Sequence, residues 1–379
     1  MATTLAGALG TLPDGVFDRL ADGYGDGEAL DLLAAAELAV NRALVSEILA
    51  ETAAGGELLA EVEREAPETF DAVLSHPFVR AWAVSCFDGG KAEPDRTAAI
   101  AAAVAVRAGI VADVQVHAHD GLVHLPTVGV FEAPAPQVRV TVGPSLFVLR
   151  WPGGRAELPA TGGRDGPGWH AARWVTLDGV RVQLEDADPY REHLTYAPAG
   201  RLDAAAHEDW AALLAQAWQH IADDAPGQLD GLRHGLRAIV PLAEDPAGGL
   251  RSASSRHAFG ALGLSRTGDP AAAAVLLVHE FQHTKLSALL DLIDLVATPA
   301  ARLPVGWRAD PRPVEAVLQG AYAHLAVADL WRRRGDEARY RRHRAWTTEA
   351  VGALLTGGHL TEAGVRFAEH MAATVRSWP

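Results

Sequence analysis

The chain has 379 residues and a formal net charge of −15, and 49% of its residues are hydrophobic while 21% are charged. This length allows two or three domains with a large core, and the negative charge excludes the overall basic surface of a nucleic-acid-binding protein. The single cysteine, Cys86, excludes an intramolecular disulfide and a cysteine-based zinc knuckle, and it favours a reducing compartment.

The N-terminal segment, residues 1–7, lacks the basic and apolar regions of a signal peptide. The chain also has no apolar run of about 18 residues, the length that a membrane-spanning helix needs. We therefore expect a cytoplasmic protein whose partners include neither nucleic acid nor a membrane.

Residues 1–108 are predicted to form a helical N-terminal region. Alanine, leucine and glutamate recur there at helical spacing, and His76-Pro77 predicts a bend because a residue that precedes proline disfavours the helical conformation. The expected helices are Glu28–Thr52, Thr69–Phe87 and Thr97–Arg107.

Residues 109–200 are predicted to form a middle, mainly antiparallel β region. Apolar and polar residues alternate in several short runs that Gly, Pro and Asp separate, and Asp178-Gly179 predicts a hairpin turn within Trp174–Leu184. The other expected strands include Val114–His119, Gln137–Val142 and Ser145–Trp151. An edge strand here is a candidate surface for an extended peptide. We interpret His117, His119 and His124 as surface histidines rather than as a second metal site.

Residues 201–379 are predicted to form a mainly helical, metal-binding domain, which makes the whole chain an α+β protein. A proline-rich link, Thr298–Pro313, precedes the helix that follows the metal motif. The expected helices are Ala204–Asp223, Leu229–Leu242, Ala273–Leu295, Val314–Arg334, Arg339–Leu355 and Glu362–Trp378.

An HExxH motif, His279-Glu280-x-x-His283, lies inside the apolar helix expected over Ala273–Leu295. On a helix the two histidines are separated by about 40° around the axis and roughly 6 Å along it, so that both rings can bind one metal ion. Burying two histidines and a glutamate is costly unless something binds them. The motif therefore predicts a metal site formed by His279 and His283, with Glu280 close by.

A third metal ligand is expected from the helix Val314–Arg334. Small residues form a stripe on one face of this helix and favour close approach to another helix, and Gln319 and His324 flank the stripe. His324 is favoured by geometry, whereas Glu315 would complete the two-histidine, one-carboxylate pattern of non-heme iron. Both residues remain candidates for the third ligand.

Two arginines, Arg256 and Arg312, are candidates for an anion clamp near the metal. Arg256 lies in a Ser- and Gly-rich segment, and Arg312 lies between two prolines. A guanidinium group on a stiff loop can bind a carboxylate through two parallel hydrogen bonds. The alternative is an ordinary loop salt bridge, for example between Arg312 and Asp310.

Taken together, these segments resemble the HExxH-motif peptide-modification proteins that are encoded beside precursors of ribosomally made natural products. The resemblance is strongest over residues 235–370. It is carried by Ser254–Ser265, Leu277–Leu286, Trp307–Pro313, Leu318–His324 and Leu360–Phe367, and more weakly by His76–Trp82, Leu125–Gly129 and Asp188–Arg191.

The resemblance implies an Fe(II)- and 2-oxoglutarate-dependent dioxygenase that uses O₂ to hydroxylate the β-carbon of a residue in a ribosomally synthesised precursor peptide. In that case His279, His283 and a third side chain bind the iron, and Arg312 or Arg256 pairs with the distal carboxylate of 2-oxoglutarate. Gln319 joins them as a candidate for cofactor binding. Glu280, the candidate catalytic residue, would orient a ligand or a peptide group.

Two other functions remain open from the residues alone. In a zinc metallopeptidase, which could cut a leader peptide, Glu280 would be the general base that acts on zinc-bound water. In a non-catalytic peptide-binding partner, the motif would be kept without chemistry.

Overall fold

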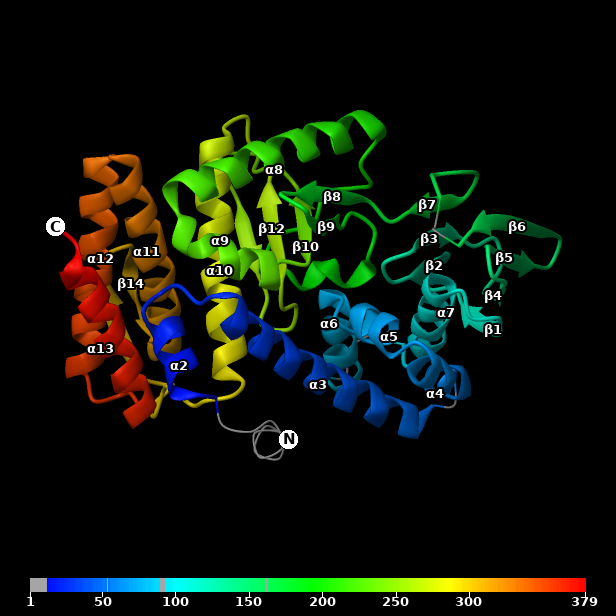
Figure 1. Ribbon diagram of the computed structural model, residues 1–379, viewed down its shortest axis with the longest axis horizontal. Helices are drawn as coiled ribbons and strands as arrows, with labels where there is room; N and C mark the ends of the chain where they lie inside the picture. The colour runs from blue at the N-terminus through cyan, green and yellow to red at the C-terminus, as the bar shows by residue number, and fades with distance from the viewer. Residues whose placement is uncertain (1–11, 53, 89–92, 161–162) are drawn as a thin grey trace.

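The computed structural model describes residues 12–379 except residues 53, 89–92 and 161–162. The segment on which we based the expected absence of a signal peptide lies outside these residues. Figure 1 shows a central sheet covered by helices, with a helical group on the side of the C-terminus and a β region on the other side. The chain therefore has the predicted α+β fold, with a helical C-terminal part and a middle β region. Among the described helices, none combines the length and the apolar character needed to cross a membrane.

The N-terminal part is helical as predicted. Its helices contact both the C-terminal helices and the β region. Helix α2 packs against α13 near the C-terminus, where the rings of Phe17 and Phe367 lie 5.8 Å apart. The long helix α3 runs from there to the β region (Figure 1). The bounds are α2 Asp14–Ala21, α3 Gly27–Glu51, α4 Gly56–Glu65, α5 Pro67–Leu74, α6 Pro77–Phe87 and α7 Arg96–Ala108. The predicted bend at His76-Pro77 separates α5 from α6.

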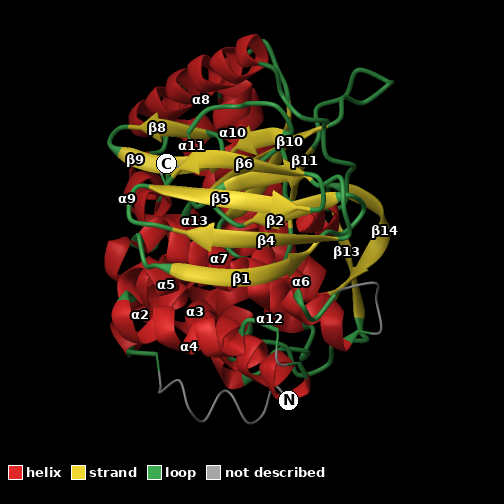
Figure 2. Ribbon diagram, turned by 90° about the vertical axis from the view of Figure 1, so that its right-hand side faces the viewer, coloured by secondary structure: helices red, strands yellow, loops and turns green. Residues whose placement is uncertain are grey.

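The β region contains two antiparallel sheets that pack with α4–α7 into one hydrophobic core. The four-stranded sheet has the order β1-β4-β5-β6 and faces the viewer in Figure 2. The bounds are β1 Ala112–His117, β2 Leu122–Leu125, β3 Gly129–Glu132, β4 Gln137–Val142, β5 Leu146–Trp151, β6 Gly154–Pro159 and β7 Trp169–Ala171. The antiparallel pairing confirms the prediction from alternating residues.

A five-stranded mixed sheet, in the order β11-β12-β10-β9-β8, lies at the centre. Its first hairpin turns at Asp178-Gly179, where both residues have positive φ as the predicted turn requires. The bounds are β8 Trp174–Leu177, β9 Val180–Leu184, η1 Pro189–His193, α8 Ala204–Asp224, α9 Pro226–Gly235, β10 Ala238–Leu242, β11 Ser252–Ser254 and β12 Ala261–Ser265.

The predicted helix Leu229–Leu242 is wrong in its second half. Helix α9 ends at Gly235, and β10 then enters the sheet between β9 and β12, parallel to both. All five residues of β10 are buried, so the strand has no polar alternation that would distinguish it from a buried helical segment.

The C-terminal helices form a layered group beside this sheet. Helix α10 packs on β11 and β12 with one side and on α11 with the other, and α12 and α13 follow (Figure 1). The predicted proline-rich link is a hairpin of β13 and β14 that leads directly into α11. The bounds are α10 Pro270–Leu290, β13 Arg302–Val305, β14 Arg308–Pro313, α11 Val314–Arg334, α12 Glu337–Thr356 and α13 Glu362–Ser377.

Candidate metal centre

The HExxH motif lies in the middle of α10, as predicted. The helix begins cleanly because the Asp269 carboxylate accepts a hydrogen bond from the Ala271 N–H and Pro270 occupies the first turn. The Nε2 atoms of His279 and His283 lie 3.2 Å apart. Two nitrogens bound to one metal at about 2.0–2.1 Å are themselves separated by roughly 3–3.4 Å. The two rings are thus arranged as a pair of metal ligands would be.

His324 brings a third imidazole near this pair from α11. Its ring centroid lies 5.8 Å from that of His279. The Nδ1 atom of His324 lies 3.1 Å from Nδ1 of His343 on α12, which leaves Nε2 of His324 available to a metal. Trp307 and Trp346 flank the His324 ring at centroid distances of 4.8 and 5.1 Å.

The surroundings keep His279 and His324 neutral, which is the form that binds a metal. Burial lowers the pKa of His279 well below its ordinary value, and the neighbouring His283, His324 and His343 lower it further. Burial, together with His343 and His283, lowers the pKa of His324 to about 3.

Gln319 orients His283. The side-chain oxygen of Gln319 lies 2.9 Å from His283 Nδ1, and the Gln319 amide nitrogen donates to Ser287 Oγ at 3.2 Å. Because Nδ1–H donates to Gln319, the lone pair of His283 lies on Nε2, on the side of His279. The structure therefore places Gln319, a predicted cofactor-binding residue, behind a metal-ligand candidate.

Glu315, the other candidate for the third metal ligand, lies at a different place on α11 than His324. It lines the same pocket but lies nine residues earlier on α11, which corresponds to about 13 Å along the helix. Its carboxylate forms an ion pair with Arg256 at 3.3 Å.

Glu280 points toward the central sheet. Its side chain is buried, and its two carboxylate oxygens accept hydrogen bonds from Ser252 Oγ at 2.7 Å and Ser254 Oγ at 2.8 Å. Both serines belong to β11, and Glu280 is not among the residues that line the histidine pocket. Through these two hydrogen bonds, Glu280 connects α10 to β11 of the sheet.

The histidines open onto a pocket of ≈ 800 Å³ whose outer wall is the β13–β14 hairpin. Arg308 and Arg312 line this wall from alternating positions of β14 that share one face of the strand. Arg312 also forms an ion pair with Asp310 at 3.1 Å, whereas Arg308 has no carboxylate partner among the described residues. The wall is cationic and suits an anionic ligand.

Arg256, the other predicted clamp, is engaged elsewhere. It binds Asp291 at 2.7 Å and Glu315 at 3.3 Å, and it does not line the pocket. Asp291 in turn pairs with the buried Arg80, so Arg256 belongs to an ionic network at the end of α10.

Sequence reasoning missed Arg308, His343 and the two tryptophans. One signal for His343 was available, since Tyr340, His343 and Thr347 recur at helical spacing within an arginine-rich run, and Tyr340 and Thr347 are buried. The same spacing places His343 on the inner face of α12.

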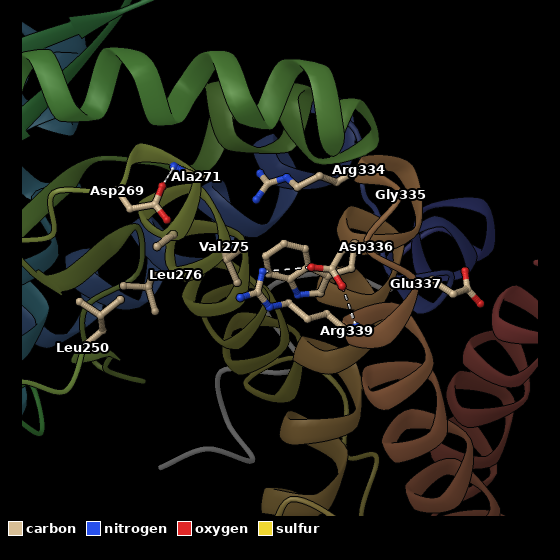
Figure 3. A pocket seen from close by; sticks show the side chains of 12 residues that line it. Leu250, Asp269, Ala271, Val275, Leu276, Arg334, Gly335, Asp336, Glu337 and Arg339 are labelled. Carbon is tan, nitrogen blue, oxygen red and sulfur yellow. Dashed lines mark hydrogen bonds and ion pairs between the residues drawn. The ribbon is translucent and has the colours of Figure 1, made fainter.

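A second pocket of ≈ 790 Å³ is lined mainly by residues at the ends of α10, α11 and α12 (Figure 3). Val275 precedes His279 by one helical turn, Trp331 follows His324 by two turns, and Arg339 precedes His343 by one turn. Its floor is apolar, and its rim carries both charges, including Asp269, Arg334, Asp336 and Glu337. On α10 and α11, the two pockets therefore lie along the same helix faces. His279, His283 and His324 line the first pocket.

When the chain is compared with models of protein families, no model matches, and no curated protein matches either. The residues of the site therefore carry the functional conclusion alone.

Proposed function

We propose that the protein is an Fe(II)- and 2-oxoglutarate-dependent dioxygenase that hydroxylates the β-carbon of a residue in a ribosomally made precursor peptide. The observation that carries this proposal is the 3.2 Å separation of the Nε2 atoms of His279 and His283, beside a third histidine and a wall with two arginines. Fe(II) fits this set because imidazoles suit iron and the pocket leaves room for further ligands.

His279, His283 and His324 are proposed to hold the metal, since the rings of His283 and His324 lie 4.8 and 5.8 Å from that of His279, whereas Glu315 is paired with Arg256. The nitrogens of these three described histidines do not all lie within 4.8 Å of one another, so metal binding would draw the rings closer together. Gln319 and His343 hold the rings of His283 and His324 through their Nδ1 atoms. Bound iron with 2-oxoglutarate supplies the oxidising chemistry, in which one atom of O₂ enters the peptide C–H bond and the other enters succinate as CO₂ leaves.

Arg312 and Arg308 are proposed to bind the distal carboxylate of 2-oxoglutarate. Guanidinium groups form the strongest hydrogen bonds to carboxylates, and these two line the same pocket as the histidines. Asp310 restrains Arg312 at the mouth and leaves Arg308 free of an ion pair within the described part of the chain.

The second pocket supports an extended substrate. Together the pockets have more room than a small acid needs, and both follow α10 and α11, with α12 joining at the second pocket. A peptide that passes over the histidines could place flanking residues on the apolar floor formed by Val275, Leu276 and Trp331. Acting on newly made peptides would place the protein in the cytoplasm.

A zinc metallopeptidase is the alternative that the HExxH motif itself favours. Such an enzyme needs the motif glutamate beside the metal-bound water. The Glu280 carboxylate instead accepts hydrogen bonds from Ser252 and Ser254 on β11, and this placement favours the hydroxylase.

The decisive experiment is anaerobic addition of Fe(II) and then 2-oxoglutarate, followed by visible absorption. We expect a weak metal-to-ligand charge-transfer band that is absent from His283→Ala and present in His170→Ala, a control at a partly exposed histidine of the β region. Tight zinc binding without such a band would contradict the hydroxylase and support the peptidase. Retained stoichiometric metal in both His279→Ala and His283→Ala would place the metal elsewhere.

A further inference from the structure

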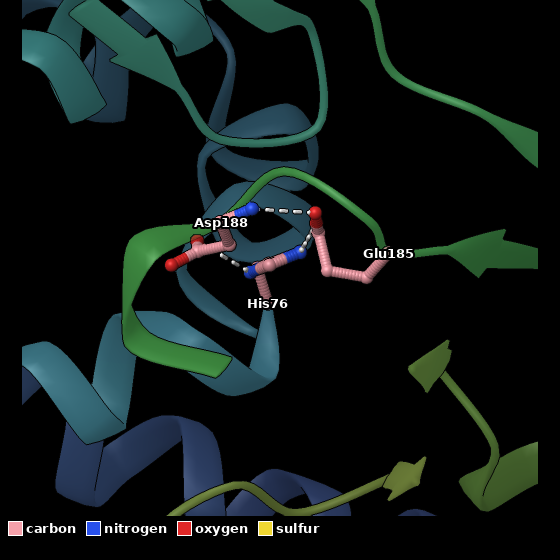
Figure 4. Close-up of side chains that lie close together, drawn as sticks. All are labelled: His76, Glu185 and Asp188. Carbon is pink, nitrogen blue, oxygen red and sulfur yellow. Dashed lines mark hydrogen bonds and ion pairs between the residues drawn. The ribbon is translucent and has the colours of Figure 1, made fainter. Parts of the chain in front are cut away.

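A second cluster of potential metal ligands lies far from the HExxH helix. His76 precedes α6, and Glu185 and Asp188 follow β9 (Figure 4). One ligand atom from each of these residues lies within 4.8 Å of the others, and the three residues are 4%, 1% and 0% exposed. Among the described residues no other group of three such side chains meets these limits.

The two carboxylates of the cluster have different partners. Arg96 donates to Asp188 Oδ2 at 2.8 Å and balances one carboxylate. Glu185 receives only neutral donors apart from His76: the Gln183 amide at 2.6 Å and the backbone N–H groups of Ala187 and Asp188. Glu185 therefore has no arginine or lysine partner among the described residues, and a buried carboxylate without one is costly in a protein interior.

His124 lies beside the cluster. Its Nδ1 is 3.6 Å from Asp188 Oδ2 and 3.3 Å from a guanidinium nitrogen of Arg96, and its side chain is buried. Its buried position also corrects our interpretation of His124 as a surface histidine. His117 and His119 do lie at the surface, where they pair with Asp95 and, for His119, with Glu93 as well.

The geometry of His76 points to a cation in the cluster. Its Nε2 lies 3.2 Å from Glu185 Oε2, while its Nδ1 is buried, has no hydrogen-bond partner and lies 3.9 Å from Asp188 Oδ2. If Nδ1 carries the proton, the lone pair of Nε2 faces Glu185 Oε2 with no proton between them. Two ligands bound to one metal at about 2.0–2.1 Å are roughly 3–3.4 Å apart, so the 3.2 Å separation of Nε2 and Oε2 fits a metal that both bind.

We propose that His76, Glu185 and Asp188 bind a structural zinc ion. An imidazole with carboxylates forms a donor set that zinc accepts, and the three residues are buried away from any substrate. The ion would join the start of α6 to the segment after β9. Because the ligands are buried, the ion would enter during folding and exchange slowly.

Two segments that carried the weaker part of the sequence resemblance meet at this cluster. They are His76–Trp82 and Asp188–Arg191. The HExxH site uses none of these ligands, so the zinc proposal does not depend on the hydroxylase.

The test uses the His279→Ala/His283→Ala variant, which removes the proposed iron site. The protein is produced with zinc, dialysed against zinc-free buffer and measured by elemental analysis. We expect roughly one zinc per chain, and a fall in melting temperature when a strong chelator removes it. Adding Glu185→Gln or His76→Gln should abolish both the zinc and the chelator effect, while His170→Gln at the exposed pair with Glu132 should leave both unchanged.

Two variants are used because one alone could fail to fold, and circular dichroism identifies which remain native. A native His279→Ala/His283→Ala protein that takes up no zinc at saturating concentration would overturn the proposal. Zinc that persists in both native Glu185→Gln and native His76→Gln proteins would overturn it as well. Absence of the charge-transfer band from the protein with both HExxH histidines intact, with zinc retained at His76, would refute only the hydroxylase.

Discussion

The side-chain oxygen of Gln319 on α11 lies 2.9 Å from Nδ1 of His283 on α10. This contact joins two helices whose histidines are proposed to bind one metal, and it fixes which nitrogen of His283 faces the site. Outer partners of this kind typically change metal affinity by about 10–100-fold.

Replacing Gln319 by leucine should therefore weaken Fe(II) binding by roughly 10–100-fold without removing a ligand. The measurement is anaerobic titration of metal-free protein with Fe(II). Ser287→Ala, which removes only the hydroxyl behind Gln319, is the matched control and should have a much smaller effect. Equal affinity in Gln319→Leu and wild type would show that the contact does not orient the metal ligand.

The two arginines of β14 should control the affinity for 2-oxoglutarate. Hydrogen bonds to charged groups contribute about 1.5–3 kcal/mol, so Arg312→Ala or Arg308→Ala should raise the Kd of 2-oxoglutarate by roughly 10–100-fold while Fe(II) still binds. Titration of the charge-transfer band measures this. Arg256→Ala is the informative comparison, because Arg256 pairs with Asp291 and Glu315 outside the pocket lining. A larger effect from Arg256 than from both β14 arginines would reverse the assignment.

Replacing Glu280 should lower the free energy of unfolding more than it changes metal binding. Glu280→Ala removes the acceptor of two buried hydrogen bonds and leaves a cavity, so it should lower the free energy of unfolding by about 2–4 kcal/mol. Urea denaturation measures the loss, and the charge-transfer band of the folded variant should persist. Ser252→Ala/Ser254→Ala should reproduce part of the destabilisation. If Glu280→Gln were fully stable but abolished peptide turnover, Glu280 would have the catalytic role of a peptidase.

Acidic pH should destabilise the metal-free protein through its histidines. Burial is the largest cause that lowers the pKa of His324 to about 3 and of His343 to about 4, against 6.5 in the unfolded chain. Below pH 6.5 the unfolded chain therefore binds protons that the folded chain does not, and the stability present above that pH is lost as the pH falls toward about 4.

The measurement is the urea midpoint of chelator-treated protein at about pH 7.5 and about pH 5. Wild type should lose more stability over this interval than His324→Gln/His343→Gln, which lacks two of the responsible groups. Equal losses would assign the pH dependence to other groups.

The local patterns of the chain predicted most of the elements and the centre of the site. The α10 helix, the antiparallel pairing of the β region and the Asp178-Gly179 turn depend on neighbouring residues, so sequence periodicity captures them. The fully buried β10 was missed because its periodicity is the same as that of a buried helix segment.

The relationships between distant residues could not be predicted. Glu280 points to β11 because the sheet contacts that side of α10, and nothing within HExxH encodes this orientation. His76 and Glu185 are 109 positions apart and meet only when α6 packs beside the segment after β9. His324 could be named as a candidate from its own helix, whereas its contact with His343 depends on how α12 folds back along α11.

The β13–β14 hairpin contributes Trp307, Arg308 and Arg312 to the pocket, whereas His279, His283 and His324 lie on helices. In the proposed enzyme the short hairpin would select the acid that enters, and the helices would select the ion. Evolution can exchange or re-size such a hairpin without rebuilding the helices, so relatives with the same histidines and a different hairpin would be the natural place to look for altered co-substrate preference.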